Sequence, residues 1–290
     1  MFFPTVIPEE GAEFRPPIHL VPWALTPYDH FYFVWPIAAV YKATPVWDYR
    51  YGGIYFGPDI IHTGIDLPAP LDTEVMAAGP GTVVWAGYGL YSGVKDNRDD
   101  PFGLAVAIRH DFGYNNLPLF TVYAHMSEVD VIPGQWVNTG DLVGNVGETG
   151  MTTGPHLHFE VRLGENDFWE TRNPELWLAP PQGYGVIAGR VMSTHGTVLD
   201  SYLVTIKSLA TGLYTTVKTY AALNVHRDEY YQENVVVGGL PEGLYEINIP
   251  YGALNRIVTV QVLPGQVTFF NFYGFDGYEF GGPVKPTPTP

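Results

Sequence analysis

Short apolar segments separated by glycine and other turn-forming residues run through most of the chain. In the first half they include EVMAAGPGTVVWAG at 74–87, GLAVAIRH at 103–110, LFTVYAHMS at 119–127 and HLHFEVR at 156–162. Brief β-branched segments bounded by turn residues are typical of strands. No long window repeats with the period of a helix. The pattern predicts an all-β chain whose first part is an antiparallel β domain.

A second series of the same kind follows a proline-containing joint. Its seven segments are GVIAGRVMS, YLVTIKSL, LYTTVKTY, NVVVGGL, GLYEINIPY, RIVTVQVL and QVTFFNFY. Seven short strands over about ninety residues favour a small β-sandwich.

The two ends of the chain differ from these series. Prolines at 4, 8, 16, 17, 22, 27 and 36, interleaved with aromatics, forbid long helices and central strands near the N-terminus. The C-terminus, PVKPTPTP, has the composition of either a stiff linker or a disordered, frayed end. We therefore expect an extended arm at 1–52, a first β domain at 53–180, a sandwich at 181–275 and a tail at 276–290.

Charge and cysteine content exclude several classes of function. The chain has 14 Lys or Arg against 30 Asp or Glu, a formal net charge of −16, so it lacks the cations that a nucleic-acid binder needs. It has no cysteine, which removes disulfides and thiolate metal sites. No run of about 18 apolar residues predicts a transmembrane segment. We expect a monomer.

Histidines in three segments are candidates for metal chemistry. His62 and Asp66 stand four apart in HTGID, and positions i and i+4 of an extended chain face the same way. His156 and His158 stand two apart on a predicted strand, so both leave the same face. His125 ends another predicted strand, in TVYAHMS.

These residue types suit a catalytic zinc ion, which takes three His, Asp or Glu ligands and keeps a fourth position for water. His62, Asp66 and one histidine of the HLH pair would supply them, and two histidines would remain as acid–base groups. Taken singly, each piece also fits a plain structural role: a surface pair, a half-buried pair, or a histidine bonded to backbone.

The segments HTGID, YAHMS and GPHLHFEVR resemble the lysostaphin-type zinc endopeptidases that cut peptidoglycan peptides. The resemblance implies a β domain with a groove across an antiparallel sheet and one zinc ion held by His62, Asp66 and His158. It also implies that His156 is the general base and His125 its partner, although the sequence leaves open which of the two is the base. Stem or cross-bridge peptides of peptidoglycan would be the substrate, and the substrate-binding residues stay unknown.

Some features depart from the family or stand outside it. YFGPDIIHTG lacks the arginine that the family often carries before its first histidine, and the loop at 89–103 is longer and more acidic than usual. That loop is either a solvated turn or a calcium site, the former being favoured. The second series resembles carboxypeptidase-regulatory, prealbumin-like sandwich modules. Within it, residues 226–229 (HRDE) are expected to form a solvated loop.

Two other functions remain open at this stage. One is a non-catalytic scaffold that binds the wall or activates other hydrolases; the intact set of five residues favours catalysis. A distant third is a phosphocarrier of sugar permeases, which lacks the HxxxD element. The substrate implies an extracellular or cell-envelope location, with an export signal trimmed from this chain. The arm either covers apolar surface or blocks the groove, where His19 or His30 would cap the metal.

Overall fold

The computed structural model describes residues 21, 24–26, 28–37, 49–54, 60–221 and 225–281. By its internal contacts the chain divides into two compact units. Among the described residues, the first takes in 33–37 and 63–174, and the second takes in those of 21–32, 49–62 and 175–281. Expectations for His19, for the segment preceding Ile60 and for the last nine residues of the tail lie outside the described residues. The domain limits given above stay predictions.

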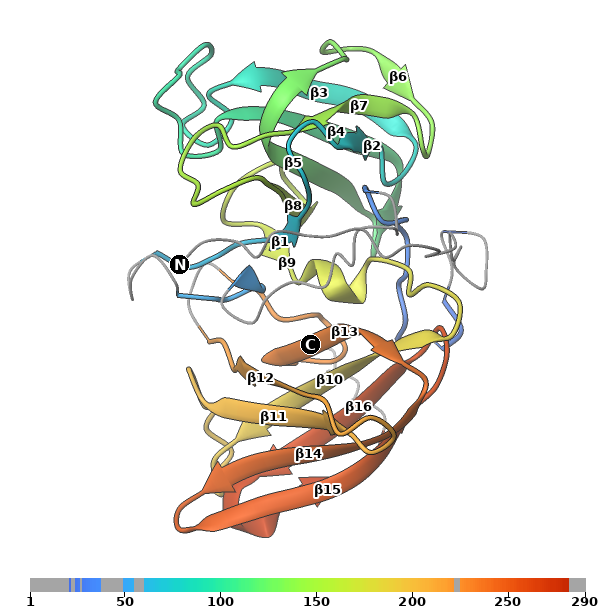
Figure 1. The fold of residues 1–290 in the computed structure, drawn as a ribbon, viewed down its shortest axis with the longest axis vertical. Helices are drawn as coiled ribbons and strands as arrows, with labels where there is room; N and C mark the ends of the chain where they lie inside the picture. The colour runs from blue at the N-terminus through green and yellow to red at the C-terminus, as the bar shows by residue number, and fades with distance from the viewer. Residues whose placement is uncertain are drawn as a thin grey trace. The chain divides into compact units, whose positions relative to one another are not determined.

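The first unit is built on a nine-stranded antiparallel sheet, whose main path runs β1-β8-β5-β4-β3-β6. Figure 1 shows the long strands β4 and β5 within this sheet. Its strands are β1 (Ile65–Pro68), β2 (Glu74–Met76), β3 (Gly81–Tyr88), β4 (Leu104–Tyr114), β5 (Leu117–Val129), β6 (Trp136–Val137), β7 (Leu142–Val146), β8 (His156–Leu163) and β9 (Thr171–Arg172). No α-helix occurs in the described residues, and the all-β prediction is confirmed.

Local sequence explains the longest hairpin of this sheet. Strands β4 and β5 are joined at Asn115 and Asn116, which both have positive φ, 49° and 63°. Asparagine tolerates this left-handed conformation, and two such residues form the hairpin turn whose twist matches that of the strands. The turn therefore fixes the pairing of β5, which carries His125, with its neighbours.

One segment of the arm packs within this unit. Phe33 is fully buried, and its ring lies 4.6 Å from that of His110. Its neighbour Val34 donates its N–H to the carbonyl of Ala78. His110 in turn bonds the carbonyl of Pro80 through Nδ1 and the hydroxyl of Thr121 through Nε2. This part of the arm completes the core, as an apolar strap does.

The second unit is a sandwich of two four-stranded sheets, β13-β10-β16-β17 and β12-β11-β14-β15. All seven predicted strands are present, with an added short strand: β10 (Tyr184–Met192), β11 (Leu203–Ser208), β12 (Tyr214–Lys218), β13 (Val235–Pro241), β14 (Gly243–Tyr251), β15 (Leu254–Val262), β16 (Val267–Tyr273) and β17 (Tyr278–Glu279). Buried side chains of both sheets, Ile187 and Phe270 opposite Ile206 and Ile247 among them, form one core. The 3-10 turns are η2 (Pro174–Leu176) and η3 (Gly274–Asp276). Strand β17 pairs with β16, so ordered pairing extends past residue 275.

Another part of the arm belongs to this second unit. Tyr32 donates its N–H to the carbonyl of Trp177. His30 is buried and forms an ion pair with Asp228, Nε2 to Oδ2 3.1 Å. The prediction of a solvated loop at 226–229 is wrong at Asp228, which is 2% exposed. The reason is that the arm supplies a cationic partner for this carboxylate.

The part of the chain that the structure describes contains no helix long and apolar enough to cross a membrane.

Candidate metal centre

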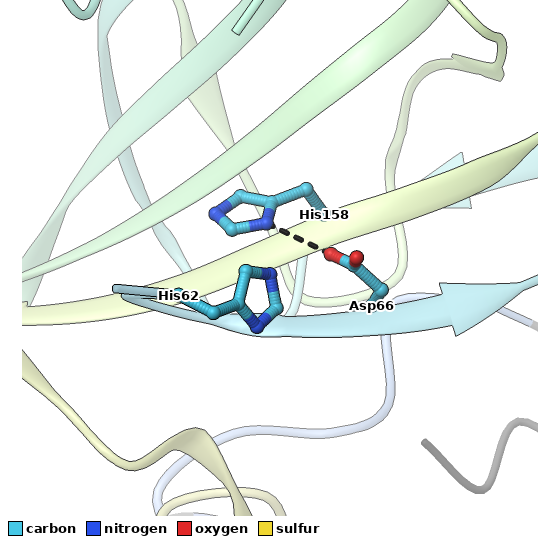
Figure 2. Close-up of side chains that lie close together, drawn as sticks. All are labelled: His62, Asp66 and His158. Atoms are coloured by element: carbon cyan, nitrogen blue, oxygen red, sulfur yellow. Dashed lines mark hydrogen bonds and ion pairs between the residues drawn. The ribbon is translucent and has the colours of Figure 1, made fainter. Parts of the chain in front are cut away.

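His62, Asp66 and His158 come together in the structure. Each offers one ligand atom, and these atoms all lie within 4.8 Å of one another. Figure 2 shows His62 and Asp66 on one chain segment and His158 on the neighbouring strand β8, with the imidazole of His158 bonded to the Asp66 carboxylate. Strand pairing is the cause: β1 runs antiparallel to β8, and Asp66 is the direct partner of His158. Two candidate ligands more than ninety positions apart thus become neighbours.

Hydrogen bonds to backbone and carboxylate oxygens set the proton position on the proposed ligands. His62 donates from Nδ1 to the carbonyl of Arg50 at 3.1 Å, which leaves the lone pair on Nε2. His158 is turned the other way: its Nε2 lies 3.2 Å from Glu160 Oε1, and its Nδ1 lies 2.9 Å from Asp66 Oδ1. A cation in this group would therefore meet Nε2 of one histidine and Nδ1 of the other.

The electrostatics of this group are dominated by buried carboxylates. Burial lowers the pKa of His158, but hydrogen bonds and charges of Asp66 and Glu160 outweigh it and raise the pKa to about 9. Burial raises the pKa of Glu160, but Arg162 and His158 outweigh it and bring the pKa to about 2. The site thus holds two carboxylates that favour a bound positive charge.

His125 reaches the group because the backbone is irregular there. Its neighbour Ala124 is the direct partner of His158 in the β5–β8 pairing, so regular alternation would aim His125 to the other face. Instead His125 has φ +63°, and the pairings of β5 with β4 and with β7 shift register beside it. A bulge of this kind re-aims a side chain. The conformation is strained for a residue with a side chain, and such strain concentrates at functional sites.

His125 and His156 are held in the same way. Each bonds a backbone carbonyl through Nδ1 at 2.8 Å, His125 to Thr149 and His156 to Gly154. A carbonyl only accepts, so Nδ1 carries the proton and Nε2 carries the lone pair in the neutral ring. The two rings lie 4.8 Å apart, and Nε2 of His156 is 3.6 Å from Asp66 Oδ2. Burial, with the neighbouring histidines His156 and His158, holds the pKa of His125 well below its usual value. Both rings present a proton-accepting nitrogen.

The sequence analysis missed Glu160 and Arg162. Both are buried, and they continue the face of β8 that carries His156 and His158, since alternate residues of a strand share a face. The signal was present in HLHFEVR, where the polar residues keep a spacing of two throughout. The sequence prediction used only the two histidines of this stripe and gave no role to Glu160 and Arg162.

The donor set suits zinc. Imidazole nitrogens and a carboxylate oxygen are zinc ligands at about 2.0–2.2 Å, which in a tetrahedral site places donors roughly 3.4 Å apart. The observed limit of 4.8 Å needs side-chain shifts of only about 1 Å. With three protein donors, a fourth position is left for water or substrate.

The acidic loop at 89–103 braces one side of this unit. Asp100 is fully buried and accepts bonds from the backbone N–H groups of Tyr91, Ser92 and Phe102 and from the Ser92 hydroxyl. The favoured prediction of a solvated turn is therefore wrong for this carboxylate, because the loop folds back on it. Phe102, at the end of this loop, contacts the site, since its ring centroid lies 5.3 Å from that of His158.

The fold and the site thus define a β domain with a clustered His–Asp–His donor group. Residues 60–169 match the model of Peptidase family M23. The DD-carboxypeptidase/endopeptidase Mpg of Neisseria meningitidis is 40% identical over 103 residues, 36% of this chain and 20% of that protein. The peptidoglycan DD-endopeptidase ShyA of Vibrio cholerae is 37% identical over 101 residues, 34% of this chain and 20% of that protein.

Among solved structures, the catalytic domain of lysostaphin from Staphylococcus simulans is 27% identical, covers 43% of this chain and 86% of that chain, and has a TM-score of 0.36. The match of residues 60–169 to Peptidase family M23 agrees with the resemblance found in the sequence. The chain spans about a fifth of the length of the curated relatives that it matches.

Proposed function

We propose that the chain is a zinc-dependent endopeptidase that hydrolyses peptide bonds in the stem or cross-bridge peptides of peptidoglycan. The observation that carries the proposal is the convergence of His62, Asp66 and His158 within 4.8 Å, beside two more histidines that each present Nε2. These three residues would hold a single zinc ion. When bound, zinc polarises the scissile carbonyl and makes a coordinated water more acidic.

The remaining roles fall to His156 and His125. A ring whose Nδ1–H is tied to a carbonyl keeps Nε2 available for one proton. We assign proton acceptance from the attacking water, and later donation to the leaving amine, to His156, whose Nε2 lies 3.6 Å from Asp66 Oδ2. His125, whose Nδ1–H is bonded to the Thr149 carbonyl and whose pKa burial holds low, would accept a hydrogen bond from the attacking water at Nε2 and so orient and polarise it.

The substrate class is supported by the relatives, one of which is the peptidoglycan DD-endopeptidase ShyA. A substrate of this kind lies outside the cytoplasm, so we propose action in the cell envelope or beyond the cell. The negative net charge of the chain supports a preference for neutral or cationic peptides, because a formal charge of −16 repels anionic polymers. Action as a monomer is part of the same proposal.

Purified protein, zinc and isolated peptidoglycan test the function directly. We expect one zinc per chain and the release of soluble fragments with new amino termini, read by mass spectrometry. Asp66→Ala should lose both zinc and cleavage. His156→Ala should keep zinc but lower kcat by about 100-fold or more, as removal of a general base does.

The non-catalytic alternative predicts a different result. A wild type that binds the wall without zinc, or with zinc but without cleavage of any peptidoglycan tried, would support a scaffold and contradict the proposal. His195→Ala serves as the control, because this histidine is exposed and belongs to the second unit. Its activity should equal that of the wild type.

A further inference from the structure

A stripe of four polar side chains occupies one face of β8. His156, His158, Glu160 and Arg162 alternate with the core residues of the other face, and all four are at most 4% exposed. The histidines are used by the proposed reaction. A buried Glu–Arg pair has no part in it, and burying two charges costs free energy that a pair of apolar residues would not cost. The pair therefore calls for a role of its own.

Glu160 joins the two chain segments that carry the proposed ligands. Its Oε1 accepts from the hydroxyl of Thr63 at 2.5 Å and lies 3.2 Å from Nε2 of His158. Thr63 is the residue after His62. The other carboxylate oxygen of Glu160, Oε2, accepts from Arg162 Nε at 2.8 Å, with Nη2 at 2.6 Å. One carboxylate thus touches a metal ligand on one side and a fixed cation on the other.

Hydrogen-bond chemistry then dictates how His158 carries its proton. Carboxylates face both ring nitrogens and only accept, Asp66 at Nδ1 and Glu160 at Nε2; a cation held between Nδ1 and Asp66 would leave Glu160 as the acceptor, so that His158 would donate from Nε2. In the neutral ring the lone pair is left on Nδ1, the nitrogen that faces Asp66 at 2.9 Å. We propose that Glu160 is a positioning residue, which fixes the tautomer and orientation of His158 so that Nδ1 is the atom offered to the metal. The inference rests on the proposed zinc site, and Arg162 supports it by holding Glu160 in place.

The substitution Glu160→Gln should reverse the arrangement without changing the shape of the side chain. Arg162 has only donors, so it draws the new amide oxygen to the place that Oε2 occupies in the wild type. The amide NH₂ then faces Nε2 of His158, which has to accept, and the proton moves to Nδ1. The ring would offer its lone pair away from Asp66. Replacing Arg162 as well should release the amide, which can turn its oxygen back to His158.

Zinc affinity of the full chain is the first test, measured by competition with a chromogenic chelator. We expect Glu160→Gln to bind zinc about 10–100-fold more weakly than the wild type, the usual cost of removing such a partner. Glu160→Gln/Arg162→Met should regain most of that loss. Glu233→Gln is the matched control: Glu233 is fully buried and bonds Tyr220 in the second unit, and its loss should leave affinity unchanged. The unfolding temperature of each zinc-free variant shows that it is folded.

The second test needs the wild type alone. Long-range proton–nitrogen NMR spectra of the zinc-loaded, ¹⁵N-histidine-labelled protein should show His158 protonated at Nε2, and protonation at Nδ1 would overturn the inference even if the variants did not fold. Wild-type zinc binding with equal affinity in Glu160→Gln would overturn the inference alone, as would a double variant as weak as the single one. A wild type that binds no zinc would overturn the proposed function, and the inference with it.

Discussion

Acid should destabilise the first unit through His110. Its Nδ1 bonds the carbonyl of Pro80 at 3.0 Å, its Nε2 bonds the Thr121 hydroxyl at 2.9 Å, and aromatic rings of Phe33 and Phe112 pack on it. None of these four neighbours carries a charge. Burial therefore lowers the pKa of His110 to about 4, from an ordinary value of 6.5.

The sign and size of the effect follow from linkage. The unfolded chain takes up a proton at His110 below pH 6.5, whereas the folded chain does so only near pH 4. Stability is therefore complete above pH 6.5 and falls as the pH drops through this window. With about 1.4 kcal/mol for each pKa unit, the loss approaches about 3 kcal/mol by pH 4.

Urea unfolding of the wild type and His110→Gln, followed by circular dichroism in the presence of a chelator, measures this effect. His110→Gln carries a constant cost but should lack the pH-dependent part, so the stability difference between the two proteins should shrink by about 3 kcal/mol from about pH 8 to about pH 4. His195→Gln, at an exposed histidine, should follow the wild type. A difference that stays constant within about 1 kcal/mol would refute the assignment of a neutral, buried His110.

Two further changes probe the site and the arm. Gly64→Ala should weaken zinc binding at least tenfold in chelator competition and lower the unfolding temperature, because a Cβ there would lie 2.4 Å from the Phe159 carbonyl oxygen and 2.9 Å from the His158 ring. Gly281→Ala is the control, because open space surrounds that position. Equal zinc affinity in the two variants would contradict the argument. Asp228→Asn should lower the free energy of unfolding of the second unit by about 1–3 kcal/mol in urea, because His30 loses its buried partner. Adding His30→Gln to this variant should lower the stability little further. A double variant whose loss equals the sum of the two single losses would show that the pair is not coupled.

The sequence predicted the strands well because their signals are local. Alternation in HLHFEVR predicted that His156 and His158 share a face, and β8 bears this out. Turn residues and β-branched runs likewise identified all seven strands of the sandwich. Each of these inferences uses only neighbours along the chain.

Non-local features could not be predicted in this way. The approach of Asp66 to His158 depends on the register of two strands, and that of His125 depends on a bulge with positive φ. Neither is encoded by a nearby motif, so the resemblance to a family had to supply them. Burial of Asp228 was missed for the same reason, since its partner, His30, lies about two hundred positions away.

The way the N-terminal residues are shared has a consequence for engineering. Residues 33–37 belong to one compact unit, while the described residues of 21–32 and 49–62 belong to the other. A graft of residues 63–174 into a foreign protein would leave Phe33 behind and open the core beside His110 to water. Domain transplants and truncations of this chain should therefore keep together the two or three backbone segments that form one compact unit. A single cut between the two units along the sequence would not do so.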